Sequence, residues 1–195
     1  MSATATISIE RALADFLSEQ RLRLADASFR RYLEVVDLFV SSLNNYGHDA
    51  LSERERRRFA DAYDAGDEQA FCHLFGPEKI PEHLGFFLGY FMVCKVFASR
   101  ELLRAAGTVT GRLVGWLERE GYVEADVAAE AIERAKAAAR DLPRADRLGE
   151  LLADLTDADP PGGLEELADD CFERADIVGQ IQRHVGGITH ASDKS

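Results

Sequence analysis

Arginine side chains make up the densest group in the sequence that could bind an anion. Four of them fall within five positions, at Arg54, Arg56, Arg57 and Arg58. A guanidinium group donates paired hydrogen bonds to phosphate oxygens, so this cluster is a candidate contact for the backbone of a nucleic acid. The competing interpretation is a solvated helix face, because four acidic residues flank the cluster: Glu53, Glu55, Asp61 and Asp64.

A second polar face is predicted on a helix that begins after Ser99, a residue type that caps helices well. At about 100° per residue, five side chains that could contact phosphate fall on one side of this helix: Arg100, Arg104, Thr108, Arg112 and Arg119. The apolar side chains of the same stretch fall on the opposite side and are expected to face the core.

Three glycines share the arginine side of that helix, at Gly107, Gly111 and Gly115. A glycine inside a helix costs about 0.5–1 kcal/mol relative to alanine, so three in register require a closely approaching neighbour. The neighbour could be another helix of the chain, the same face of a second copy in a homodimer, or a phosphate backbone. A P-loop is excluded, because its Lys-Ser/Thr pair and its preceding strand are both missing.

No catalytic, cofactor-binding or metal-binding site is predicted. Cys72, His73, His83 and Cys94 lack the paired local spacing that builds a tetrahedral metal site. No G-x-S-x-G motif is present, and neighbouring carboxylates such as Asp169 and Asp170 point in different directions on a helix. An aromatic block is expected to be core; it comprises Phe86, Phe87, Tyr90, Phe91 and Phe97. We therefore expect a protein that is not an enzyme.

Composition sets limits on compartment and partners. The chain has 195 residues, is 46% hydrophobic and carries a net charge of -12, which argues against a protein coated in nucleic acid but leaves room for a local basic face. The N-terminus lacks the features of a signal peptide, and the longest apolar run, 84–94, is too short to span a membrane. Three scattered cysteines do not suggest a disulfide framework. A cytoplasmic protein without membrane contact is predicted.

Helical periodicity extends along nearly the whole chain, and no convincing strand is present, so an all-α fold is predicted. One apolar stripe defines a first helix near 9–24, Ser28 is expected to cap a second that stops near Asn44–Gly47, and Ser52 with Glu55 forms a capping-box pair that opens a short basic helix. Further helices are expected at 67–75, 81–98, 99–121, 124–140 and 145–155, with the Ala-rich 124–140 solvated and Pro143 breaking the chain after it.

These elements suggest a bundle of four to six helices over residues 7–122 and an appended helical pair over 124–155. A Pro/Gly linker follows at 156–163, and then an acidic tail with one helix at 164–195. Charge is concentrated at that end of the chain. Residues 1–60 hold nine basic and nine acidic residues, whereas residues 151–195 hold three basic and ten acidic ones, a net charge of -7.

Three segments resemble a known family of domains. ALADFLSEQR, from Ala12 to Arg21, and SFRRYLEVVDLF, from Ser28 to Phe39, are similar to the first two helices of the core-binding, SAM-like domain of tyrosine recombinases and phage integrases. LEREGY, from Leu117 to Tyr122, resembles the end of that domain's last helix. The similarity covers about residues 8–125 and implies a helical bundle of DNA-binding type.

The strand-exchange chemistry of that family is not expected in this chain. It requires an arginine, a His-x-x-Arg box and a nucleophilic tyrosine, because a phosphodiester is attacked while its charge is held. None of the five histidines has an arginine three residues later, and only about 70 residues follow the similar region. The resemblance therefore implies the fold without the catalytic domain.

Two functional hypotheses follow from these patterns. The first is a non-catalytic module that binds duplex DNA through the two arginine sets, with the acidic tail competing for them. The second is a homodimeric scaffold protein that associates through the face of Gly107, Gly111 and Gly115 and binds no nucleic acid.

Overall fold

The computed structural model describes residues 7–96 and 98–156. All regular elements in this part of the chain are helical, which confirms the predicted all-α fold. The α-helices are α1 (Ile9–Arg23), α2 (Asp26–Tyr46), α3 (Glu53–Asp64), α4 (Ala70–Leu74), α5 (Ile80–Phe86), α6 (Arg100–Arg119) and α7 (Ala125–Thr156). A π-helix, η3 (Phe87–Lys95), continues α5, and two short 3-10 turns lie at Gly47–Ala50 and Pro77–Lys79. The predicted tail at 164–195 and all but the first residue of the predicted linker lie outside the described residues.

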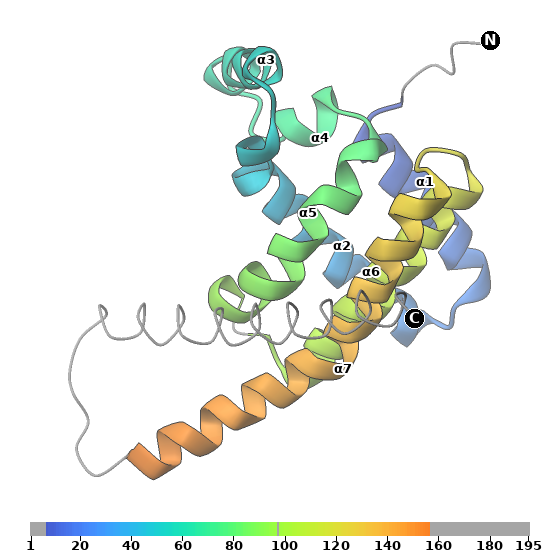
Figure 1. Cartoon of the computed structure of the whole chain (residues 1–195). Coiled ribbons are helices and arrows are strands. Elements are labelled where there is room, and N and C mark those ends of the chain that lie inside the picture. Colours follow the sequence, from blue (N-terminus) through green and yellow to red (C-terminus); the bar gives the residue numbers. More distant parts are fainter. Residues whose placement is uncertain (1–6, 97, 157–195) are drawn as a thin grey trace, which may run out of the picture.

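The bundle is built around the pair formed by α6 and α7, which lie side by side (Figure 1). Helix α2 packs on α6, and α5 with η3 packs on α7. A single apolar cluster joins all of these helices. Its largest fully buried side chains include Phe16, Phe39 and Phe87. Helix α3 lies apart from the α6–α7 pair, beside α4 at one end of the molecule.

Serine caps fix the starts of three helices. Ser8 caps α1, Ser52 caps α3 and Ser99 caps α6, each accepting a hydrogen bond from a backbone N–H of the first turn. The last two were predicted. The prediction for Ser28 was wrong, because α2 begins at Asp26 and the cap position is Ala25, three residues before Ser28. An acidic first-turn residue stabilises the positive end of the helix dipole, and the carboxylate of Asp26 also accepts a hydrogen bond from Arg21 at 2.6 Å.

The apolar stretch expected to be one helix over 81–98 has two geometries. Helix α5 passes into the π-helix η3, which ends at Lys95. A short apolar run gives similar patterns for both geometries, so periodicity did not distinguish them. Of the aromatic block, Phe87 and Phe91 are buried in the core as predicted, Phe86 and Tyr90 are half-buried, and Phe97 is outside the described residues.

Helix α7 corrects two predictions for 124–155. Its Ala-rich face is not solvated but packs against α6, with Ala128, Ala131, Ala135 and Ala138 buried. The backbone also stays helical through residue 143 up to Thr156, so this region is one helix rather than a pair. An internal proline removes one i→i−4 hydrogen bond, and here that loss does not end the helix. Residues 125–142 therefore belong to the bundle and are not an appendage.

The glycines of α6 allow that packing. A Cβ atom on Gly107 would lie 2.5 Å from the backbone nitrogen of Ala139 and 2.6 Å from the carbonyl oxygen of Ala135. Gly111 and Gly115 face the same helix at ordinary contact distances, 3.5 Å and 3.8 Å. Intramolecular helix packing is thus the correct alternative for this face. At Gly107, α7 occupies the space that a second copy or a phosphate backbone would need.

Substitution of Gly107 tests this contact. We expect Gly107→Ala to destabilise the fold by about 1–3 kcal/mol, because the new methyl group meets backbone atoms that cannot rotate away. Gly111→Ala is the matched control: its methyl group has room, and alanine is the better helix former by about 1 kcal/mol. Urea unfolding followed by circular dichroism would measure both. Equal effects of the two substitutions would contradict the proposed contact.

A buried polar pair links α2 to α5. The Ser42 hydroxyl lies 2.7 Å from Nε2 of His83, and both side chains are buried. Aromatic rings surround the imidazole, with Phe39 at 6.1 Å and Phe86 at 5.3 Å between ring centroids. Burial lowers the pKa of His83 to about 4, although Asp49 opposes this. The imidazole is therefore neutral in the folded protein near neutral pH.

Stability should fall in acid because of this histidine. The pKa of His83 is lower in the folded than in the unfolded chain, so between about pH 6.5 and 4 only the unfolded chain binds the proton. We expect His83 to remove roughly 3 kcal/mol of stability across that window. The free energy of unfolding, measured in urea at several pH values, should depend less on pH in His83→Gln than in the wild type.

His73 supplies a control of opposite sign. Its hydrogen bond to Asp67, 2.9 Å from Nδ1, raises the pKa of His73. Protonation of His73 therefore stabilises the fold as the pH falls through the raised value, and His73→Gln should make the acid loss steeper. If both variants changed the pH dependence in the same direction, the account of His83 would be wrong.

Candidate nucleic-acid interface

Helix α3 is attached to the bundle by one side and exposed on the others. Phe59 is its one buried side chain. The Phe59 ring stacks on His48 at 5.5 Å and meets Phe71 edge-on at 6.3 Å, measured between ring centroids. In Figure 1 the helix lies at the edge of the molecule, next to α4. Most of its charged side chains are therefore exposed to solvent.

A capping box fixes the first turn of α3. Both the backbone N–H and the hydroxyl of Ser52 donate to the Glu55 carboxylate, at 2.9 and 2.6 Å, and Lys79 lies 3.2 Å from its other oxygen. The Ser52 hydrogen bonds hold the pKa of Glu55 at about 2. The predicted capping box is thus confirmed, and it fixes the start of the helix that carries the arginines.

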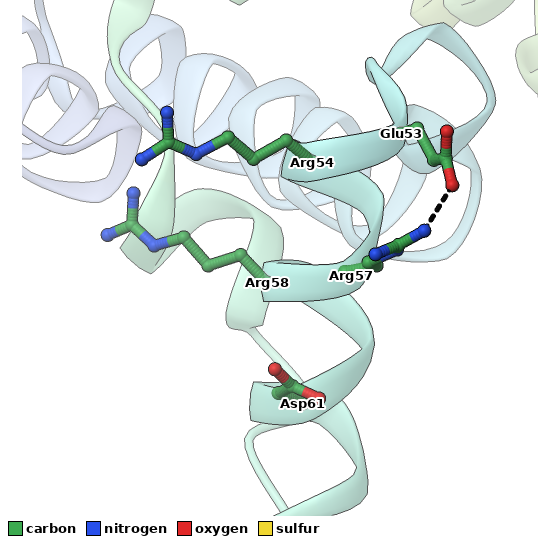
Figure 2. Close-up of a pocket in the computed structure, with 5 residues that line it drawn as sticks. All are labelled: Glu53, Arg54, Arg57, Arg58 and Asp61. Carbon is green, nitrogen blue, oxygen red and sulfur yellow. Dashed lines mark hydrogen bonds and ion pairs between the residues drawn. The ribbon is translucent and has the colours of Figure 1, made fainter.

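Five charged side chains of α3 line a hollow on its surface. Figure 2 shows them: Glu53, Arg54, Arg57, Arg58 and Asp61. The arms of Arg54 and Arg58, one turn apart, extend side by side in the same direction. Arg57 points elsewhere and forms an ion pair with Glu53. The hollow thus has a pair of parallel guanidinium groups on one side and a neutralised pair on the other.

The predicted cluster of four arginines divides by what each one contacts. Arg57 is neutralised by Glu53, and Arg56 donates to the backbone oxygen of Leu51 at 3.2 Å. Within the described part of the chain, Arg54 and Arg58 form no ion pair or hydrogen bond through their side chains. The predicted balance by flanking acidic residues therefore applies to Arg57, whereas Arg54 and Arg58 have no such partner among the described residues.

The predicted arginine face of α6 is largely used inside the fold. Arg112 donates to the Tyr32 hydroxyl at 2.7 Å and lies over its ring, and Arg119 pairs with Glu19 and Glu120. Thr108 donates to the backbone oxygen of Arg104 at 3.0 Å. Arg104 itself is exposed. Arg100 also has an interaction of its own, so the set does not form a continuous row of available cations.

The structure does not bring the two arginine sets together. Helix α3 lies at one end of the molecule, and α6 runs beneath α7 in Figure 1. The two arginine sets therefore lie on separate parts of the molecule. We therefore take the hollow of α3 as the candidate site.

Glu19 has a structural role that the sequence analysis missed. Its carboxylate accepts hydrogen bonds from Arg119 and, at 3.0 Å, from the indole nitrogen of Trp116, which ties α1 to α6. The Arg119 hydrogen bond is the main reason why the pKa of Glu19 is lowered. These partners are about 100 positions apart in sequence, so no local pattern could have indicated them.

Other classes of site receive no support from the described residues. Among them, no three His, Cys, Asp or Glu side chains gather as metal ligands would. Cys72 is buried, and its burial raises the thiol pKa to about 12, so it is a poor nucleophile. In the same part of the chain, no helix is long and apolar enough to cross a membrane.

Comparisons with known proteins leave the resemblance to core-binding domains as a prediction. No protein-family model, curated protein or solved structure matches the chain.

The capping box should be necessary for the order of α3. Ser52→Ala removes the hydroxyl that accepts from the backbone N–H of Glu55, and we expect a loss of about 1 kcal/mol in stability. Ser18→Ala is a control, because that hydroxyl bonds only within α1, to the oxygen of Ala14. Hydrogen exchange of the α3 amides should rise in Ser52→Ala alone; unchanged exchange would contradict the role of the cap.

Proposed function

We propose that this protein is a non-catalytic helical module that binds duplex DNA through Arg54 and Arg58 of α3. The observation that carries the proposal is the pair of parallel guanidinium groups, one helical turn apart, which face solvent without an acidic partner among the described residues. Most other arginines in that part of the chain have such a partner or another hydrogen-bond acceptor, as at Arg21, Arg112 and Arg119.

Exposed arginines lose little hydration on meeting DNA, and contact with a phosphate releases counterions. The resemblance to core-binding domains supports the same partner. A net charge of -12 makes the protein as a whole repel DNA, so the binding should be weak and should fall steeply with salt. A cytoplasmic location is compatible with this function in a cell whose DNA lies in the cytoplasm.

Binding can be tested with the full-length chain and a fluorescently labelled duplex of 30 base pairs. We expect anisotropy to report binding at about 50 mM salt that weakens strongly by about 200 mM. The double variant Arg54→Ala/Arg58→Ala should lose roughly tenfold or more in affinity at the lower salt concentration and show a shallower salt dependence.

A matched control separates a local site from overall charge. Arg11→Ala/Arg134→Ala makes the same change in net charge. These residues lie on α1 and α7, and each pairs within its own helix, with Asp15 and Glu130 respectively. The control should bind nearly as well as the wild type. If both double variants lost affinity equally, the α3 site would be excluded. If the wild type did not bind the duplex at either salt concentration, the proposed function would be wrong.

A further inference from the structure

The hollow on α3 contains an acidic side chain that a surface built for phosphate alone would not need. Asp61 lines it together with the arginines, and within the described part of the chain its carboxylate forms no ion pair or hydrogen bond. Once Arg57 and Glu53 neutralise each other, the remaining charges are those of Arg54, Arg58 and Asp61, a net charge of +1. A carboxylate repels phosphate, so its presence suggests a ligand that also offers a hydrogen-bond donor.

Arg58 and Asp61 are three positions apart on α3, so their side chains are neighbours on the helix surface. Both line the hollow, where the Arg58 guanidinium extends beside that of Arg54 and forms no ion pair with Asp61, so the same surface offers guanidinium donors and a carboxylate acceptor. The major-groove edge of a G·C base pair has the complementary order, with N7 and O6 of guanine as adjacent acceptors and N4 of cytosine as a donor. An A·T pair does not present two adjacent acceptors, so it cannot accept both hydrogen bonds from one arginine.

The shape of α3 allows it to approach base edges. An α-helix with its side chains is about 10–12 Å across, and the major groove is about 12 Å wide. Nine of the 12 residues of α3 are exposed and only Phe59 is buried. The helix also lies at the edge of the molecule (Figure 1), so its exposed side could enter a groove before the body of the bundle met the DNA.

We infer that Arg58 and Asp61 recognise the major-groove edge of a G·C base pair while Arg54 binds an adjacent phosphate. This inference rests on the proposed function and assigns a separate role to each of the three side chains. The charges balance, because the Arg58–Asp61 pair is neutral like the base pair and the single positive charge of Arg54 matches one phosphodiester. The recognition is therefore of one base pair, with a modest preference rather than a long specific sequence.

The test compares two labelled duplexes of equal length, one with a central block of G·C pairs and one with a central block of A·T pairs. Full-length wild-type protein should bind the G·C duplex about tenfold more tightly at low salt. Arg58→Ala should abolish this preference. Arg54→Ala should instead weaken binding to both duplexes equally and reduce the slope of log affinity against log salt by about 0.9.

Asp61→Ala is the decisive variant, with Asp64→Ala as its control. Asp64 is exposed on the same helix but does not line the hollow, so both variants make the same change in net charge. Asp61→Ala should lose most of the preference for G·C, and Asp64→Ala should keep it. If Asp61→Ala instead raised affinity for both duplexes equally, Asp61 would only repel phosphate and the inference would be overturned, while the proposed function stood. If the wild type bound neither duplex, the proposed function itself would fail.

Discussion

The close approach of α6 and α7 is the contact on which the rest of the bundle depends. At Gly107 the two backbones come so near that even a methyl group has no room, and α7 presents alanines along the same line. Small residues on both helices therefore replace the larger side chains that usually separate packed helices. Because α2 packs on α6 while α5 and η3 pack on α7, the spacing of this pair sets the positions of the other helices.

Polar contacts then fix how the outer helices are oriented on that pair. Glu19 on α1 receives hydrogen bonds from Trp116 and Arg119 on α6, and Arg112 of α6 reaches the Tyr32 hydroxyl on α2. The Ser42–His83 pair plays the same part between α2 and α5, in a site sealed from solvent. These interactions use side chains that would otherwise be free to bind partners, which is why the polar face of α6 contributes little to the candidate site.

Helix α3 is less constrained, because Phe59 is its one buried side chain. Its remaining residues are free to carry charge, and their pattern is mixed rather than uniformly basic. The arginines at Arg54 and Arg58 stay available because Glu53 is occupied by Arg57 and Glu55 by the capping box. A local balance of this kind lets an acidic protein present a small basic surface.

Local patterns were enough to predict the helical class, the caps at Ser52 and Ser99, and the end of α2, because these depend on contacts between residues a few positions apart. They also showed that the glycines of α6 needed a close neighbour. Long-range packing, in contrast, makes α7 this neighbour, buries the alanine face of α7, and pairs Arg112 with Tyr32 and Arg119 with Glu19. Those outcomes depend on partners far apart in the chain, and a local pattern cannot indicate which distant side chain will neutralise an arginine and which arginine will remain free.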